Sequence, residues 1–495
     1  MKRKDQEDIV GRFYLRGHEV VSWPGMLSIS REAVLRLLIL LDGPENELPP
    51  LLSPFRGGVQ VDLIGESNAR GVITLFGCAC ENYRTSQHAP DGNVSIELTF
   101  RPTSIWVGPR SLDLDDDFNR LRLGFRGIHG VIGTKPIARK RIRSADDKSI
   151  VASLLGDADD VFYVNPSSKY YGISMADPSI EIRFGSGYSR SASWTEGETI
   201  STYDECCISS RGAVHATELI SVGAKVERFL SFICLVTIRS VDFDLEVFAS
   251  EEGPPERFQR VWCLAARESS EGLMFHEALS SWRCEEAHME TALRNWLSRS
   301  EDEALARWLY LDVQDQNVIS VGRFISVCQA VEIVGRRAMG AAPFDKDRFR
   351  LASQRAAEVI CEALGEEFQT LHYKNRFRGL VSSGNRHSFR DHLYAFASEI
   401  PASIKRVLLP DEDLFITKLV RMRNLLIHMD DGAITFDQAE RELGEMIFRL
   451  LALFAVHQGV SLGLDPSRVL SGLQNSSIGR SALHYLHRAR QTSAN

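Results

Sequence analysis

The sequence contains no uncharged apolar run of about 18 residues, the length that a membrane-spanning helix requires. The nearest candidate, residues 229–238, has ten residues and charged neighbours on both sides, so we expect it in a protein core. The N-terminal residues are charged and no apolar segment follows them, which predicts that the chain has no secretory signal. These absences favour a cytoplasmic protein that has no membrane partner.

The cysteine and glycine patterns exclude two further kinds of site. The chain has nine cysteines, an odd number, and no Cys-x-x-Cys motif. The close pairs Cys78/Cys80 and Cys206/Cys207 have no second pair at zinc-ligand spacing, so we expect reduced thiols and no metal site. No glycine-rich loop precedes a Lys-Ser or Lys-Thr, the pattern of a nucleotide phosphate loop, and no cofactor is predicted.

The charge balance gives no general preference for a polyanion. The net charge is −8, and residues 1–300 carry all of this excess, with 42 acidic and 34 basic side chains. Residues 301–495 carry 24 of each sign. Any affinity of the C-terminal part for a polyanion must therefore come from the local placement of cations.

The N-terminal part of the chain has the pattern of a β-rich domain. Short runs of β-branched and aromatic residues alternate with turn clusters at 91–93, 185–187 and 253–255. Two segments, 31–41 and 224–238, have the spacing of helices. The predicted strands are residues 58–64, 71–76, 94–100, 104–107, 180–184 and 241–248. We expect a sandwich-like or partly open barrel domain with a few helices over residues 1–290.

The C-terminal part has apolar residues at helical spacing. The predicted helices are residues 301–312, 318–339, 345–364, 411–428 and 436–458. They imply a four-helix-type bundle over residues 291–460, so the fold class is α+β with two domains. Residues 373–390, which contain glycine, serine and several basic residues, are predicted as a surface excursion, and residues 461–495 as a C-terminal tail.

Arg423, Asn424 and His428 form the most suggestive polar cluster. On a helix, Asn424 and His428 lie one turn apart, and Arg423 lies on the adjoining edge. A guanidinium binds phosphate oxygens and an imidazole moves a proton near neutral pH, so the cluster suits a phosphodiester. In RNA the 2′-hydroxyl is a built-in nucleophile, and the chemistry requires no metal and no enzyme nucleophile.

Spacing alone carries little weight, because 47 arginines and 13 histidines in 495 residues give about one Arg-x4-His match by chance. The sequence has two such matches, Arg423/His428 and Arg283/His288. The second lies among carboxylates, which would repel a phosphate, so only the first is a credible site. His428 also has a structural interpretation, as a C-terminal histidine at the negative end of a helix dipole.

The helical region resembles a HEPN domain, a four-helix-bundle group that contains many metal-independent ribonucleases. The signature of the group is arginine, a polar residue, an apolar spacer and histidine on a late helix, which Arg423, Asn424 and His428 match. Members often carry Glu-x3-Lys/Arg on an earlier helix, and Glu332 and Arg336 match this element. The same two residues also fit an ordinary surface ion pair.

The whole chain resembles the ApeA proteins of bacterial anti-phage abortive infection, which join a β-rich N-terminal domain to a C-terminal HEPN domain. The N-terminal likeness lies in Gly-Arg-Phe-Tyr-Leu at 11–15, Pro-Gly-Met-Leu-Ser-Ile at 24–29 and Gly-Val-Ile-Thr-Leu at 71–75. The phenylalanine-rich stretch at 118–128 belongs with them. The order and the length of the two domains agree with the family.

The resemblance implies a mechanism and partners. His428 would act as general base or acid in a transesterification, and Arg423 would stabilise the charge on the phosphate. Asn424 would orient the phosphate or the imidazole. Glu332 and Arg336 would support these groups. A homodimer would bring two motifs into one cleft. A phage component bound by the N-terminal domain would activate the cleavage of RNA, with transfer RNA as one candidate substrate.

Further cations are candidates for RNA contact. The segment 372–378 interleaves aromatic and basic residues, which suits base stacking and phosphate binding but also suits an amphipathic helix end. The RNA-binding candidates are Lys374, Arg376, Arg378 and Arg421. The basic run at 135–143 and the acidic run at 115–117 are better explained as solvated surface.

Two other functions are consistent with the sequence. In the first, the bundle is a non-catalytic dimerisation or binding module beside a β-rich ligand- or protein-binding domain. In the second, the β-rich part is an enzyme domain that acts on a carbohydrate or peptide. No convergent carboxylate or Ser/His pattern supports the second.

Overall fold

The structure is a computed structural model that divides the chain into two compact units. The β-rich unit comprises residues 1–231, 238–275 and 281–297, and the helical unit comprises residues 232–237, 276–280 and 298–495. The structure describes residues 6–18, 21–30, 35–44, 60–68, 70–88, 93–125, 128–132, 137–141, 160–164, 171–174, 180–193, 197–240, 242–247, 255–261, 276–298, 300–314, 316, 318–339, 344–428 and 436–494.

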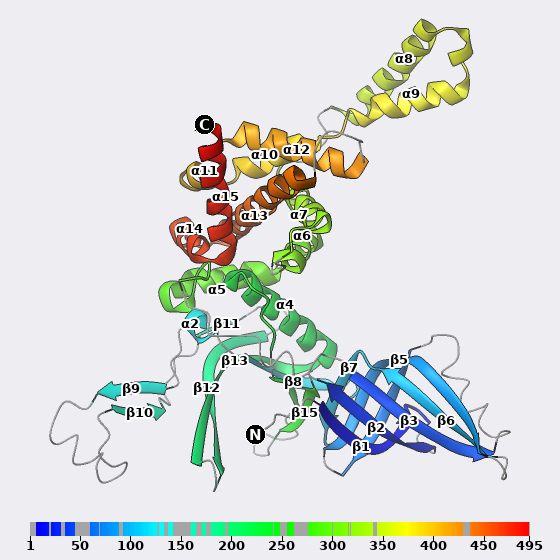
Figure 1. Cartoon of the computed structure of the whole chain (residues 1–495), viewed down its shortest axis with the longest axis vertical. Coiled ribbons are helices and arrows are strands. Elements are labelled where there is room, and N and C mark those ends of the chain that lie inside the picture. The colour runs from blue at the N-terminus through cyan, green and yellow to red at the C-terminus, as the bar shows by residue number, and fades with distance from the viewer. Residues whose placement is uncertain are drawn as a thin grey trace. The chain divides into compact units, whose positions relative to one another are not determined.

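The first six strands close into an antiparallel barrel, drawn in blue in Figure 1. They are β1 (Gln6–Leu15), β2 (Ser22–Ser30), β3 (Leu35–Pro44), β4 (Val61–Ser67), β5 (Gly71–His88) and β6 (Asn93–Arg101). The strands pair in the order β5-β4-β1-β2-β3-β6, and pairing of β6 with β5 closes the barrel. Apolar side chains fill the interior, and Phe13, Leu37, Leu75 and Phe100 are fully buried there.

Two glycines, Gly25 and Gly65, leave the space that the Phe13 ring occupies in the barrel interior. A Cβ added at Gly65 of β4 would collide with this ring, and one added at Gly25 of β2 would come within 2.7 Å of it. A side chain larger than hydrogen has no room at either position, so the glycines are a packing requirement of this barrel.

Seven further strands extend the sheet from the barrel. They are β7 (Ser104–Gly108), β8 (Asp117–Phe125), β11 (Tyr171–Ser174), β12 (Ile180–Ser193), β13 (Gly197–His215), β14 (Asp242–Val247) and β15 (Glu256–Val261), and β7 joins them to β5. β9 (Ile137–Arg141) and β10 (Asp160–Val164) form a separate two-stranded sheet.

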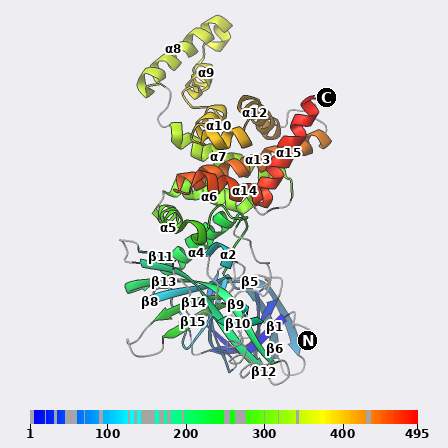
Figure 2. The same cartoon turned by 90° about the vertical axis from the view of Figure 1, so that its left-hand side faces the viewer.

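Helices pack on one face of this extension, as Figure 2 shows from the side. The described helices are α2 (His129–Ile132), α4 (Ala216–Cys234) and α5 (Trp282–Ser298). Gly223 of α4 lies so close to β8 that a Cβ there would be 2.7 Å from Leu121. The Trp282 ring of α5 contacts Phe184 and Phe229, at centroid distances of 4.5 and 6.1 Å.

The prediction of a β-rich part followed by a helical part is confirmed, and two local predictions are wrong. Of the predicted helix 31–41, residues 35–41 belong to β3, where Leu37, Ile39 and Leu41 alternate into the barrel. A continuous apolar run fits a helix or a buried strand equally well, and pairing with β2 and β6 decides it here. The predicted turn at 185–187 lies inside β12, while most of the turn clusters at 91–93 and 253–255 lie outside the described residues.

The helical unit is built around α7 (Val321–Met339), α12 (Glu412–His428) and α13 (Phe436–Ser461). The other helices are α6 (Glu301–Gln314), α8 (Lys346–Leu364), η3 (Glu366–Phe368), α9 (Leu371–Ser383), α10 (Phe389–Ser398), α11 (Ala402–Leu408), α14 (Pro466–Asn475) and α15 (Ser477–Ala494). α7 contacts α6, α10 and α13, and α12 contacts α10. Residues 442–461 of α13 are long and apolar enough to cross a membrane, but 83% of that window is buried, as in the core helix of a globular domain.

At the predicted excursion, 373–390, residues 371–383 form helix α9, in which Tyr373, Phe377 and Val381 recur at four-residue spacing. α9 packs beside α8, and the two helices form a hairpin that projects from the other helices in Figure 1. One prediction is wrong in this unit. Residues 461–495 are not a tail, since α14 and α15 pack against α13. Val469 and Ala482 are fully buried in these two helices.

Replacing Gly65 by alanine tests the barrel packing. We expect Gly65→Ala to lower the free energy of unfolding by about 1–3 kcal/mol, because the added methyl group overlaps the Phe13 ring. Chemical denaturation followed by circular dichroism measures the change. Gly212→Ala in β13 is the control, since an added Cβ there meets nothing within 4 Å. Equal losses in the two variants would contradict the close packing around Phe13.

Candidate active site

A buried arginine attaches the start of α12 to α13. Arg449, with a side chain 1% exposed, forms ion pairs with Asp411 at 2.5 Å and Glu445 at 2.8 Å. Its guanidinium lies 3.9 Å from the centroid of the Phe415 ring and also donates to the Leu408 carbonyl. Burial alone would raise the pKa of Asp411, but the hydrogen bonds and charge of Arg449 hold it below its ordinary value. The first turn of α12 is therefore fixed before the motif begins.

The helix period then decides which motif residues face the protein. Leu419 and Met422 are buried, and the Arg423 side chain is 26% exposed. Asn424 and Arg421 are exposed on the same helix. His428 is the last residue of α12, and its side chain lies outside the described set.

Glu332 of α7 joins the two predicted elements of the site. Its Oε2 accepts a hydrogen bond from Arg423 Nη2 at 3.1 Å, and its Oε1 accepts one from Arg336 Nη2 at 3.3 Å. Glu332 and Arg423 are 91 residues apart in the sequence. The carboxylate is 19% exposed and Arg336 is 65% exposed, so one cation is held between helices and the other faces solvent. The structure thus brings together three of the five predicted site residues.

α10 supplies two residues that the sequence analysis missed. The Arg423 guanidinium lies 4.4 Å from the centroid of the Phe389 ring, in the geometry of a cation–π contact. His392 Nδ1 lies 3.8 Å from Glu332 Oε1. A Cβ at Gly335 of α7 would collide with the backbone of His392, so this glycine permits the close approach of α7 and α10.

A capping box places Phe389 and His392 at the start of α10. The Asp391 amide donates to Ser388 Oγ at 3.2 Å, and the Ser388 amide donates to Asp391 Oδ2 at 2.7 Å. The hydrogen bonds from Ser388 lower the pKa of Asp391. The pattern Ser-x-x-Asp is readable in the sequence, and it would have predicted a helix that begins at residue 389.

Burial governs the protonation of two groups around Glu332. It lowers the pKa of His392, which the Glu332 carboxylate partly opposes. It raises the pKa of the Cys328 thiol, which the Arg423 charge partly opposes. Near neutral pH the cluster therefore contains a neutral imidazole, a thiol, one carboxylate and two guanidinium groups. Among the described residues no group of three or more His, Cys, Asp or Glu side chains is arranged to hold a metal ion.

The remaining candidates lie away from this cluster in the chain and in different elements. Lys374 is half-buried and Arg376 and Arg378 are exposed, all on α9, whose main contact is with α8. Of the basic run 135–143, only 137–141 are described, as strand β9. In the acidic run, Asp116 forms an ion pair with Arg110 at 2.6 Å, which agrees with a structural role of this carboxylate.

The second Arg-x4-His pair has an ordinary environment. Arg283 and His288 are exposed on α5, and His288 Nδ1 lies 3.7 Å from Glu285 Oε1 on the preceding turn. Both residues belong to the β-rich unit. This pair has the same spacing as Arg423 and His428 but lies on an exposed helix of the other unit, which makes it a matched control.

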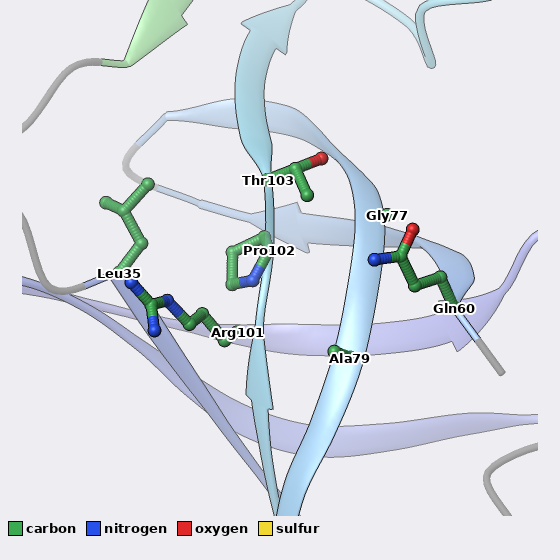
Figure 3. Close-up of a pocket in the computed structure, with 7 residues that line it drawn as sticks. All are labelled: Leu35, Gln60, Gly77, Ala79, Arg101, Pro102 and Thr103. Atoms are coloured by element: carbon green, nitrogen blue, oxygen red, sulfur yellow. The ribbon is translucent and has the colours of Figure 1, made fainter. Parts of the chain in front are cut away.

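A pocket of about 440 Å³ opens beside the barrel strands β3, β5 and β6. Figure 3 shows Leu35 and Arg101 on one side of it, Gln60 and Gly77 on the other, and Pro102 between them. Arg101 is 67% exposed and lies 3.7 Å from Glu81. Arg101 is the one charged side chain among the lining residues, and none of them is a histidine or a carboxylate, so the Glu332 cluster is the stronger candidate site.

Comparison with known families assigns both parts of the chain. Residues 8–296 match the family model for ApeA N-terminal domain 1. Residues 325–467 match the model for the Apea-like HEPN domain, and this range contains Glu332, Arg336, His392, Arg423 and His428. No curated protein and no solved structure gives a significant match.

Replacing Asp411 tests how α12 is held. We expect Asp411→Asn to lower the free energy of unfolding by about 1 kcal/mol at neutral pH, a modest value because the carboxyl is 34% exposed. Since Arg449 lowers the folded-state pKa, this stabilisation is complete above the unfolded value of about 4 and is lost as the pH falls through the folded value. Urea unfolding of both proteins across this range measures the difference.

Asp347→Asn on α8 is the control, because that side chain is 84% exposed and lies 3.8 Å from Arg350. It should leave the unfolding free energy within about 0.5 kcal/mol of the wild type. A difference between Asp411→Asn and wild type that stays constant as the pH falls would contradict the role of the ionised Asp411 carboxylate.

Proposed function

Since the chain belongs to the ApeA family of anti-phage HEPN effectors, we propose that its helical unit is a metal-independent endoribonuclease that acts in defence against phage. HEPN domains generally have ribonuclease activity. The observation that carries the proposal is the ion pair between Arg423 and Glu332. It places the Arg-Asn-x3-His segment of α12 against the Glu-x3-Arg element of α7.

The reaction is an internal transesterification of RNA. The 2′-oxygen attacks the adjacent phosphorus, the bond to the 5′-oxygen breaks, and the products are a 2′,3′-cyclic phosphate and a 5′-hydroxyl end. A base removes the proton of the 2′-hydroxyl, and an acid supplies a proton to the leaving 5′-oxygen. His428 takes one of these two roles.

Arg423 stabilises the negative charge that develops on the nonbridging phosphate oxygens. Its guanidinium is held by Glu332 and by the Phe389 ring, which fixes its position before substrate binds. Asn424 is exposed beside it, where its amide orients the phosphate or the imidazole. Arg336 offers a second, exposed cation on the other oxygen of Glu332.

Helix α9 provides an RNA-binding arm in this proposal. α9 carries Lys374, Arg376 and Arg378 and has no acidic residue in its 13 positions. Tyr373 and Phe377 lie between these cations in the sequence. Arg421, exposed on α12, adds a cation near the motif. Such local cations supply the affinity for RNA that the overall charge does not.

Three further parts of the proposal concern assembly and control. Two protomers bring their α12 motifs together, so that one cleft holds two histidines for the acid and base roles. A phage component binds to the β-rich domain in the cytoplasm and releases the nuclease, which would otherwise damage host RNA. Transfer RNA is the proposed substrate class. Sedimentation of the purified chain tests the dimer directly.

The site assignment predicts which variants lose activity. In cells expressing the protein and challenged with a panel of phages, we expect new RNA 5′-hydroxyl ends, mapped by sequencing. Arg423→Ala and His428→Ala should each reduce these ends by about 100-fold or more, because transition-state charge or proton transfer is lost. Arg283→Ala and His288→Ala are the matched controls and should retain cleavage. Wild-type cleavage by Arg423→Ala or His428→Ala would refute the site.

The RNA-binding arm makes a separate prediction. Replacing Lys374, Arg376 and Arg378 together by alanine should weaken binding of a single-stranded RNA. It should also reduce the slope of log Kd against the logarithm of the salt concentration by about 2, because each lost phosphate contact removes about 0.7 from that slope. Fluorescence anisotropy at several salt concentrations measures both. Replacing Lys346, Arg348 and Arg350 on α8 is the control with equal charge loss. The same slope in both triple variants would contradict a specific role of α9.

A second candidate function is a non-catalytic binding module. The engagement of Arg423 by Glu332 and Phe389 also fits a purely structural arginine. That function predicts a partner or RNA complex without any new 5′-hydroxyl ends after phage challenge, in wild type as in His428→Ala.

A further inference from the structure

His392 is a buried imidazole whose Nδ1 has no direct hydrogen bond. The residue is 5% exposed, and among the described residues no atom forms a hydrogen bond with Nδ1. The nearest charged atom recorded for it is Glu332 Oε1 at 3.8 Å, which is longer than a hydrogen bond. A buried polar atom without a partner costs stability, so its retention beside the Arg423 site calls for a reason.

Of the charged groups that the structure describes around His392, Glu332 is the anion that lies within 4 Å of its Nδ1. From α7, Glu332 and Arg336 face the imidazole. From its own segment, His387 lies with its ring 6.2 Å away, and the Asp391 carboxylate is occupied by the Ser388 amide and hydroxyl. α12 contributes Arg423, which reaches His392 through the shared carboxylate. Glu332 therefore stands between the imidazole and the arginine.

We propose that His392 is a positioning residue that takes up a proton when Arg423 turns from Glu332 to a phosphate of RNA. The inference rests on the proposed function for its substrate. When Arg423 Nη2 leaves Glu332 Oε2, the carboxylate loses its partly buried cation and keeps only Arg336, whose side chain is 65% exposed. Protonated His392 Nδ1 then donates a hydrogen bond to Glu332 Oε1 across the present gap of 3.8 Å. The proton comes from solvent, and the net charge around Glu332 is restored.

This exchange makes release of Arg423 less costly. Glu332 is 19% exposed, so an unbalanced carboxylate there is poorly solvated. In the free protein burial holds the pKa of His392 below its ordinary value, which keeps the imidazole neutral while Arg423 balances Glu332. In the complex the unbalanced carboxylate raises that pKa.

Linkage fixes the sign of the pH effect. The complex binds one proton more than the free protein between the lower pKa of the free state and the higher pKa of the bound state. The affinity for RNA therefore rises as the pH falls through this window, by at most about tenfold per pH unit, and is constant outside it.

The first experiment needs no RNA and no activity. In the full chain labelled with ¹³C at histidine Cε1, NMR titration follows His392, whose signal is identified by its loss in His392→Gln. Arg423→Ala should raise the His392 pKa by about one unit, and Glu332→Gln should lower it. Lys418→Ala removes another cation from α12 and should leave it unchanged. An unchanged His392 pKa in Arg423→Ala would overturn the proposal. This comparison leaves His392 itself unsubstituted.

The second experiment adds the substrate class. A 2′-O-methyl RNA oligonucleotide cannot undergo transesterification, so its binding can be measured by anisotropy from about pH 5.5 to 8. Wild type and His387→Gln should bind more tightly as the pH falls, and His392→Gln should lose this dependence. Calorimetry in buffers of different ionisation enthalpy should record proton uptake on binding in wild type and none in His392→Gln.

The two experiments separate the two ideas. If the pKa shifts in Arg423→Ala but the oligonucleotide does not bind, the coupling of His392 to Arg423 stands and the RNA substrate is wrong. If the oligonucleotide binds with the same pH dependence in His392→Gln as in wild type, the role of His392 is wrong and RNA binding stands.

Discussion

The ion pair between Glu332 and Arg423 is the interaction on which the candidate site depends. One carboxylate oxygen receives Arg423 from α12 at 3.1 Å, and the other receives Arg336 from its own helix at 3.3 Å. Neither partner of the inter-helix pair is fully buried, with side chains 19% and 26% exposed. A fully buried pair would be too costly to open, and a fully exposed one would be too weak to orient a guanidinium. The intermediate burial leaves Arg423 both placed and available.

The surrounding helices hold this pair in position by buried arginines and by glycine. Arg449 joins the start of α12 to α13, while Arg323 donates from α7 to the Val313 carbonyl at 2.9 Å, near the end of α6. Arg323 is also 2% exposed, with the Phe448 ring 5.0 Å from its guanidinium. Gly335 lets α10 approach α7 closely enough for His392 to face Glu332. The two arginines satisfy backbone carbonyls and carboxylates inside the unit, and the glycine gives α10 the space to approach α7.

The β-rich unit is built on a different constraint. Its barrel is filled by side chains such as Phe13 and Phe100, so ligand recognition there would use the outer surface or the barrel ends. On the sheet extension, the nearly buried Glu246 receives Arg122 at 3.4 Å and Arg257 at 3.0 Å. The acidic excess of the chain lies in residues 1–300, so the bulk charge of this part does not favour a polyanion.

The sequence by itself determined the β-rich and helical halves, the long helices α6, α7, α8, α12 and α13, and the Arg423 motif, because apolar periodicity and local motifs are properties of neighbouring residues. It also determined the family. Only the tertiary structure decided that the apolar run at residues 35–41 is a strand, because the same residues fit a helix until β2 and β6 pair with them. Likewise, the meeting of Glu332, Arg423, Phe389 and His392 depends on contacts between residues up to 91 positions apart. Such contacts follow from helix packing, which no local pattern encodes.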